Sequence, residues 1–362
     1  MIFYLSIGQL QQEFSHYYQS NRTCADFRTA LTNLYDRKDY ITQKPDSPNV
    51  QQFMLLDDTA FLDAARQLYY AFSSEELMKN DEYELVSEFD DMTTISQFYR
   101  TQNNVHTHDC FEIDYVFSGK CELTFLDEKR ELQEGDFFII SPYARHTTRL
   151  LTEKSCVFPI LVKEKTFDVT FFSLLSEADI LSSFFRQILT NPSEPNYLLF
   201  QTTNSTEIRP LVKMLFLEGF RMDVHVNRCG IHWLNLLFVN VLRNYSTYSQ
   251  FSYHDAGADY APILRYIKNH YKTINLEQLA QKFNYSVPYI SKIIKKVTGD
   301  SFSETIKKLK MEDASNLLIQ TDDTIEKISE HAGYNSSDHF ARTFRQYYGI
   351  SPLKYRKKNR QY

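Results

Sequence analysis

One pattern occurs twice near the C-terminal end of the chain, and it constrains the fold more than any other feature of the sequence. The first copy, LAQKFNYSVPYISKIIKKVTGDSF, begins at Leu279, and the second, ISEHAGYNSSDHFARTFRQYYGI, begins 49 residues later at Ile328. The match continues to Gly299 and Gly349, where the offset is 50 residues. A repeat of this length indicates two copies of one supersecondary unit. We therefore predict two similar small structures in series.

Each copy has the pattern of two helices joined by a tight turn. In the first copy, apolar residues recur at helical spacing, Ser286 is suited to cap the second helix, and Gly299 ends it. In the second copy, Gly333 makes the turn and Asn335 is expected to cap the second helix. A long helix over 301–320 is predicted between the copies. The pattern predicts an all-α C-terminal domain with two helix-turn-helix units.

The second helix of each copy has an apolar inner face and a polar or basic outer face. A helix that reads DNA needs both, because the inner face anchors it while the outer face enters a major groove. The outward residues expected to contact DNA are Ser291, Lys292, Lys295, His339, Arg342 and Arg345. Which of them contact bases and which contact phosphates stays open. The alternative is a generic helical bundle, in which the apolar stripes are only core.

The charge of the chain is divided unevenly. The net charge is −6, with 40 Lys and Arg against 46 Asp and Glu. Residues 259–362 hold 18 basic and 11 acidic residues, a balance of +7, so the rest holds 22 and 35, a balance of −13. A basic C-terminal module on an acidic body is expected when one end of a protein meets phosphates. A solvated basic tail is the alternative explanation.

The C-terminal segment resembles the AraC/XylS-type bacterial transcription regulators. The residues that carry the resemblance are Ile328, Gly333, Tyr334, Ser337, Phe340, Arg342, Phe344, Gly349, Pro352, Tyr355 and Arg356. The resemblance covers Leu276 to Arg360 and implies that the two units enter successive major grooves on one face of DNA. The sequence departs from the family at Ser329, Ala332 and Ile294. These are inner-face positions, so the departures concern packing rather than function.

The segment from His106 to His146 alternates short β-rich runs with turns, which is typical of a β-barrel or sandwich. The strands are expected in FEIDYVF, CELTF, ELQ and FFIISP, with LDEKR as a charged turn. The spacing of His106, His108, Glu112, Gly119, Gly135, Pro142 and His146 resembles the double-stranded β-helix of cupins. Many AraC/XylS-type regulators have a cupin-like sensor ahead of their DNA-binding domain, so the two resemblances agree.

Three interpretations of this histidine-rich segment stay open. The first is a pocket for a polar small-molecule effector, lined by His106, His108, Glu112, Tyr143, Arg145 and His146. The second is a metal site, since in cupin enzymes three His and one Glu hold a metal, and His106, His108, Glu112 and His146 match those ligands in kind. The third is a structural role at a strand end. We expect no required cofactor and keep the metal as an alternative.

The remaining segments complete an α+β multidomain prediction, with a cupin-like β-barrel sensor and the all-α C-terminal domain. The boundaries are a helical extension over 1–95, the barrel over 96–170, a helical dimerisation or packing region over 171–248, a linker over 249–260 and the DNA-binding domain over 261–362. Helices are expected over 205–222 and 228–245. The extension is either a layer packed on the barrel or a second sensing surface.

The predicted function is that of a sequence-specific DNA-binding transcription regulator, not an enzyme. The expected partners are promoter DNA, an effector such as a sugar, RNA polymerase and a second copy in a homodimer. No apolar run is long enough to span a membrane, and five scattered cysteines form no CxxC pair, so a cytoplasmic location is expected. The rival interpretation is a metal-dependent cupin enzyme with a helical appendage.

Overall fold

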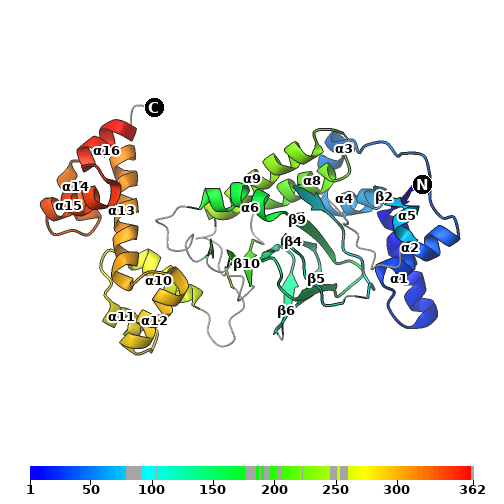
Figure 1. Ribbon diagram of the computed structural model, residues 1–362, viewed down its shortest axis with the longest axis horizontal. Helices are drawn as coiled ribbons and strands as arrows, with labels where there is room; N and C mark the ends of the chain where they lie inside the picture. The colour runs from blue at the N-terminus through cyan, green and yellow to red at the C-terminus, as the bar shows by residue number, and fades with distance from the viewer. Residues whose placement is uncertain are drawn as a thin grey trace. The chain divides into compact units, whose positions relative to one another are not determined.

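The structure is a computed structural model that describes residues 1–78, 91–102, 104–126, 128–175, 185–186, 189–190, 196–202, 206–221, 223–244, 251–252 and 260–359. Its contacts divide the chain into two compact units (Figure 1). The first unit comprises Met1–Leu174 and Asn191–His254, and the second comprises Leu175–Thr190 and Asp255–Tyr362. Among the described residues, none of the helices has both the length and the apolar character to cross a membrane.

The N-terminal segment of the first unit is a small layer of helices with a two-stranded sheet. Strands β1 (Ile2–Ser6) and β2 (Tyr69–Ser73) pair antiparallel. The helices are α1 (Ile7–Asn21), α2 (Phe27–Asp36), α3 (Val50–Met54), α4 (Asp58–Ala65) and α5 (Ser74–Leu77). Ser6 begins α1 with a capping box, in which its hydroxyl accepts from the Gln9 N–H and the Gln9 side chain accepts from the Ser6 N–H. The sequence predicted helices here but not the β1–β2 pair.

Two antiparallel sheets form the β structure of the first unit. The six-stranded sheet has the order β11-β10-β7-β4-β9-β3, and the three-stranded sheet has the order β6-β5-β8. The strands are β3 (Met92–Thr94), β4 (Phe111–Ser118), β5 (Lys120–Phe125), β6 (Glu128–Gln133), β7 (Asp136–Ile140), β8 (His146–Leu150), β9 (Cys156–Val162), β10 (Tyr197–Gln201) and β11 (Phe251–Ser252). The helical elements are α6 (Glu164–Thr170), the 3-10 turn η1 (Phe172–Leu174), α8 (Ile208–Glu218) and α9 (Val226–Asn244).

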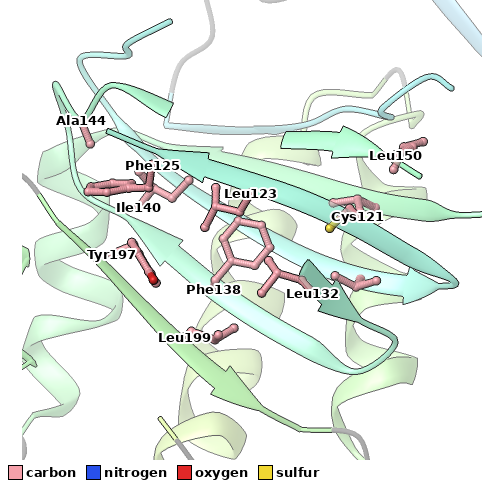
Figure 2. Close-up of a cluster of buried hydrophobic side chains, with 12 residues drawn as sticks. Cys121, Leu123, Phe125, Leu132, Phe138, Ile140, Ala144, Leu150, Tyr197 and Leu199 are labelled. Atoms are coloured by element: carbon pink, nitrogen blue, oxygen red, sulfur yellow. The ribbon is translucent and has the colours of Figure 1, made fainter. Parts of the chain in front are cut away.

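The core of the barrel lies between the two sheets (Figure 2). It consists of Val116, Cys121, Leu123, Phe125, Leu132, Phe138, Ile140, Ala144, Leu150, Val157, Tyr197 and Leu199. These side chains come from both sheets and are at most 5% exposed. Burying each of the larger ones stabilises the fold by about 1.5–3 kcal/mol.

Strand β4 is buried on both faces, so its two sets of alternate residues serve two different layers. Val116 belongs to the core between the sheets, and Glu112 and Asp114 share its face by alternation. Phe117 lies on the opposite face, where its ring centroid is 5.7 Å from that of Phe61 in α4. The strand therefore carries polar groups into the barrel and aromatic rings toward the helical layer.

Helix α4 packs on the helical side of the barrel through an aromatic contact and an ion-pair network. The Phe61 ring lies 6.3 Å from that of Phe216 in α8. Asp58 pairs with Arg209 and also with Lys213, whose Nζ lies 2.7 Å from Asp58 Oδ1. This part of the N-terminal extension is thus a layer packed on the barrel.

Replacing Asp58 by Asn should reveal the contribution of this network. Burial raises the pKa of Asp58, but hydrogen bonds from Lys213 and Arg209 outweigh burial and lower the pKa below its ordinary value of 3.8. The ionised carboxylate therefore stabilises the fold above that value, and the contribution is lost as pH falls through the lowered pKa. Because the Asp58 side chain is 41% exposed, we expect a loss of only about 1 kcal/mol at pH 7.

Urea unfolding of Asp58→Asn and wild type at pH 7 and at about pH 2.5 measures this difference, which should shrink at the lower pH. Asp63→Asn, on the exposed side of the same helix, is the matched control and should change little. An equal loss for Asp58→Asn at both pH values would contradict the ion-pair account.

The second unit is helical over its continuous described stretch, residues 260–359. Its helices are α10 (Ala261–His270), α11 (Leu276–Lys282), α12 (Val287–Thr298), α13 (Phe302–Gln320), α14 (Ile325–His331), α15 (Ser337–Tyr348) and α16 (Pro352–Asn359). The helix pairs α11–α12 and α14–α15 are the two copies of the repeat, and α13 joins them (Figure 1). The predicted α+β multidomain class with two helix-turn-helix units is confirmed.

The repeated helices α12 and α15 begin and end in the same way. The Ser286 side chain accepts from the Tyr289 N–H at the start of α12, and Gly299 ends that helix with φ 76°. In α15, the end is Gly349 with φ 75°, but the cap is Ser336. The prediction that Asn335 caps α15 was wrong, because the Ser336 side chain is the one that accepts from the His339 N–H.

Three further expectations differ from the structure in the first unit. Residues Glu128 to Arg130 were predicted in a turn, but they pair with β5 as part of β6. Strand β10 was not predicted, yet it pairs with β7 in the six-stranded sheet. Most of the predicted linker over 249–260 lies outside the described residues, and Phe251 and Ser252 within it form β11.

Candidate functional site

The predicted DNA-contacting residues lie on the two corresponding helices. Ser291, Lys292 and Lys295 lie on α12, and His339, Arg342 and Arg345 lie on α15. Ser291 is half-buried and the other five are exposed. Five of the six positions that the sequence pattern placed on the outer faces are therefore exposed, and Ser291 is partly covered.

The inner faces of these helices anchor them in apolar cores. Ile290 and Ile294 of α12 are 0% exposed, and Phe340 and Phe344 of α15 are also 0% exposed. Helix α13 has 19 residues, which corresponds to a length of about 28 Å. One turn of B-DNA is about 34–36 Å long, so a joining helix of this length suits two units that contact neighbouring turns.

Sequence reasoning did not single out two aromatic residues at the start of α12. Tyr285 and Tyr289 are 39% and 41% exposed, and their ring centroids are 4.9 Å apart. They flank the turn, where the N-terminal residues of a DNA-reading helix contact base edges. Their i, i+4 spacing across the capping residue Ser286 was the available signal.

The second candidate site is a cluster of three histidines and one carboxylate at one end of the barrel. The ligand atoms of His106, His108, Glu112 and His146 all lie within 4.8 Å of one another. Glu112 Oε2 is 2.8 Å from His146 Nε2 and 3.0 Å from His108 Nε2. Backbone hydrogen bonds pair His106 with His146 at 3.0 and 3.1 Å, which fixes the two imidazoles side by side.

The cluster runs from the surface into the barrel. His106 is exposed and His108 is half-buried, whereas Glu112 and His146 are 6% and 2% exposed. By strand register, Phe125 lies opposite His146 and Ile140 lies opposite Glu112. The polar cluster is therefore next to the Phe125–Ile140 end of the apolar core, and Figure 2 shows Phe125 and Ile140 within that core.

Electrostatics distinguish the four residues from one another. Burial raises the pKa of Glu112, but the charge and hydrogen bonds of His146 and His108 outweigh it and hold the pKa well below its ordinary value. Burial lowers the pKa of His146, and Glu112 more than reverses that effect. Desolvation by the surrounding protein atoms, although part of the side chain is exposed, and the charge of the neighbouring His146 lower the pKa of His106. The inner pair is thus ionic, and the outer His106 is neutral near pH 7.

Asp114 lies on the same face of β4, one step deeper than Glu112. Its Oδ2 accepts from the Thr148 hydroxyl at 3.3 Å, and the residue is 0% exposed. Burial and the nearby Glu112 carboxylate raise the pKa of Asp114 well above its ordinary value. A neutral Asp114 beside an ionised Glu112 keeps the buried charge of this face to one carboxylate.

The four ligand atoms fit a divalent transition metal in kind and arrangement. Imidazole nitrogens and a carboxylate oxygen suit zinc, iron, manganese or nickel. A bound ion would supply a Lewis acid that fixes and polarises an oxygen of a small molecule at this place. Without it, Glu112 already orients His108 and His146 by accepting a hydrogen bond from each.

The other two residues of the predicted effector pocket lie less close to the cluster. Tyr143 donates its N–H to the His108 carbonyl oxygen at 2.7 Å, while its side chain is 62% exposed. Arg145 is exposed, and its carbonyl oxygen accepts from the Leu126 N–H. The structure brings the ligand atoms of four of the six predicted residues within 4.8 Å of one another and leaves the side chains of the other two at the surface.

Two family models match the chain in the regions of the two sites. A model described as a helix-turn-helix domain matches residues 279–358, and one described as a cupin domain matches residues 99–163.

Similar curated proteins include two that are named as transcription regulators. An HTH-type transcriptional regulator of Haemophilus influenzae is 24% identical over 261 residues, which is 67% of this chain and 84% of that protein. The HTH-type transcriptional activator RhaS of Mannheimia succiniciproducens is 24% identical over 256 residues, 69% of this chain and 88% of RhaS. The multiple antibiotic resistance protein MarA of Escherichia coli is 30% identical over 100 residues, 27% of this chain and 79% of MarA.

Proposed function

The chain belongs to the AraC/XylS-type family of transcription regulators, and from this premise we propose how it acts. Helices α12 and α15 contact promoter DNA, and a small-molecule effector bound at the cupin-like barrel alters that contact. The observation that carries the DNA-binding part is the matched pair of capped helices, each anchored by buried apolar residues and exposing basic ones.

The sensing part of the proposal is supported by the histidine–carboxylate cluster. It offers a neutral, exposed His106 as the first group that a ligand meets and the ionic pair of Glu112 and His146 behind it. A neutral polyhydroxyl compound such as a sugar satisfies such a mixed set of donors and acceptors without bringing a further buried charge. A divalent metal held by the same four residues is the second candidate, favoured by their mutual distances.

Sensing is favoured over catalysis because the similarity to regulators is not confined to the DNA-binding helices. The match to the Haemophilus influenzae regulator extends over 261 residues, more than the second unit contains. We therefore propose that the barrel reports a ligand and does not turn over a substrate.

Three partner and location proposals follow from the same premise. The protein forms a homodimer through α8 and α9, because α9 exposes Leu236 at 46% on a helix that is apolar on several sides. When bound at a promoter, it contacts RNA polymerase and acts as an activator. It works in the cytoplasm, where promoter DNA is found.

Mapping of genomic binding sites with the tagged protein in its own host tests the regulatory function. We expect discrete promoter peaks for wild type and their loss in the Arg342→Ala, Lys292→Ala double variant, with the neighbouring genes changing in expression. The absence of peaks under every growth condition, despite a folded protein, would overturn the proposal.

Ligand binding at the cluster is tested by calorimetry and thermal shift, with a panel of monosaccharides and with ZnCl₂ and MnCl₂ as probes. One probe should raise the melting temperature of wild type, and His108→Ala should reduce its affinity about 10-fold or more, because one of the four converging groups is gone. His16→Ala, a histidine of α1, is the matched control. Equal binding by His108→Ala and wild type would show that the cluster is not the site.

DNA binding should persist when His108→Ala has lost the ligand response, since α12 and α15 are unchanged. A variant that lost activity on a substrate while DNA binding was absent in all forms would instead support the enzyme interpretation.

A further inference from the structure

One acidic residue of the joining helix α13 contacts both the turn after α10 and helix α14 of the second helix-turn-helix unit. Asp313 lies on α13 with its side chain 28% exposed. Its Oδ2 is 3.3 Å from Lys272 Nζ, in the turn after α10, and 4.0 Å from His331 Nε2, the last residue of α14. The Lys272 contact is an ion pair, and the His331 contact is a longer polar contact; neither is an aligned hydrogen bond to Asp313 Oδ2. Asp313 thus contacts one segment that precedes the first helix-turn-helix unit and one helix of the second helix-turn-helix unit.

The same turn after α10 also approaches Gly333, in the turn of the second helix-turn-helix unit. Gly333 has φ 74°, and a Cβ placed on it would lie 3.0 Å from the Lys272 carbonyl oxygen. The backbones of the two segments therefore approach closely, and any other residue at this position would be strained by the positive φ and by this contact. Burial and a hydrogen bond to Asp313 raise the pKa of the adjacent Tyr271, so Tyr271 stays a neutral donor near this contact.

Lys310 completes the connection from the other side of the turn. It precedes Asp313 by three residues on α13, so the two side chains lie on one face of the helix. Its Nζ donates to the Gly333 carbonyl oxygen at 2.9 Å and lies 5.3 Å from the centre of the Tyr334 ring. The turn between α14 and α15 is thus held both by α13 and by the segment after α10.

We propose that Asp313 is a positioning residue that fixes the spacing and relative rotation of the two DNA-reading helices α12 and α15. A single joining helix can bend, and each bend would change the distance between the two outer faces. Contacts that cross from the segment after α10 to α14 restrict that bending, so that both helices meet DNA without a further ordering cost. This inference rests on the DNA-binding function and adds the residue that sets its geometry.

The test compares the affinity for two DNA duplexes. The first is the duplex that wild type selects from a random library, with its two half-sites mapped by single base changes. The second carries one inserted base pair between the half-sites, which moves them by about 3.4 Å and rotates them by about 35°. We expect wild type to bind the second duplex about 30-fold more weakly, because rigid units cannot follow the insertion.

Asp313→Asn removes the charge and keeps the size of the side chain. We expect the variant to bind the first duplex about 5-fold more weakly than wild type does. Its affinity for the second duplex should be less than about 5-fold below its affinity for the first. Glu304→Gln is the matched control. It removes the acidic partner of Lys307 in an ion pair that lies within α13 and does not connect α13 to another segment. It should keep the spacing penalty of wild type.

Lys272→Gln provides the second variant and removes the same contact from the other partner. Like Asp313→Asn, it should reduce the ratio between the affinities for the first and second duplexes. A general loss of stability would weaken binding to both duplexes and leave that ratio unchanged. An undiminished penalty in Asp313→Asn and Lys272→Gln, both folded by circular dichroism, would overturn the proposal. Failure of wild type to select any duplex would instead overturn the DNA-binding function on which the inference rests.

Discussion

Replacing Arg342 and Lys292 together by alanine is expected to weaken DNA binding by about 100-fold or more, because each contact to a base or phosphate contributes about 1–3 kcal/mol. Both residues are exposed, one on each DNA-reading helix. Neither belongs to the core that holds α12 or α15, so the fold should be retained. Fluorescence anisotropy with a labelled duplex measures the affinity.

The salt dependence of the same binding separates specific contacts from general attraction. Loss of two cationic contacts should lower the slope of log affinity against log salt by about 2. Lys307→Ala with Lys327→Ala is the matched control, because it removes the same charge from α13 and α14. A control as weak as the test variant would mean that net charge alone drives binding, which contradicts the assignment of the two helices.

The substitution Phe344→Ala is expected to destabilise the second unit by about 3–5 kcal/mol. Phe344 is 0% exposed, and its ring lies 4.6 Å from that of Tyr348 and 5.6 Å from that of Phe340. Losses of this size are a large share of the free energy of unfolding of a typical domain. The melting temperature of the unit should fall by about 15 °C, and DNA binding should be lost near the lowered melting temperature.

The single tryptophan allows the two units to be followed separately. Trp233 lies on α9 of the first unit, so its fluorescence should show an unchanged transition in Phe344→Ala while far-ultraviolet circular dichroism shows the earlier one. Tyr348→Phe is the mild control, since it keeps the ring and removes the hydroxyl that donates to the Met311 carbonyl oxygen and bonds Ser315. A Phe344→Ala protein that melts with wild type would contradict the packing described for α15.

The second unit could be predicted from sequence because its signals are local. Ser286 and Gly299 mark the ends of α12 through side-chain and backbone preferences that act within a few residues. The error at α15 was of the same local kind: Asn335 and Ser336 are both good caps, and sequence alone does not choose between neighbours. Exposure of Arg342 and Arg345 followed from helical spacing once the inner face was known.

The first unit was predicted less completely because its strands find partners far along the chain. Strand β1 pairs with β2 across four intervening helices, and β10 reaches back to β7, and neither pairing has a local signature. The histidine–carboxylate cluster was found through a resemblance in spacing, and the structure brings His106 and His146 together through a backbone pairing. The surface position of the Tyr143 and Arg145 side chains depended on the turn between β7 and β8.

Selection of duplex DNA from a random library by the purified protein tests whether α12 and α15 each read one element of a DNA site. We expect an enriched site with two sequence elements about 10–10.5 base pairs apart, one for each DNA-reading helix. Selection with Arg342→Ala should lose one element, and selection with Lys292→Ala should lose the other. Enrichment of a single element that both substitutions affect equally, or no enrichment at all, would show that α12 and α15 do not read DNA as a pair.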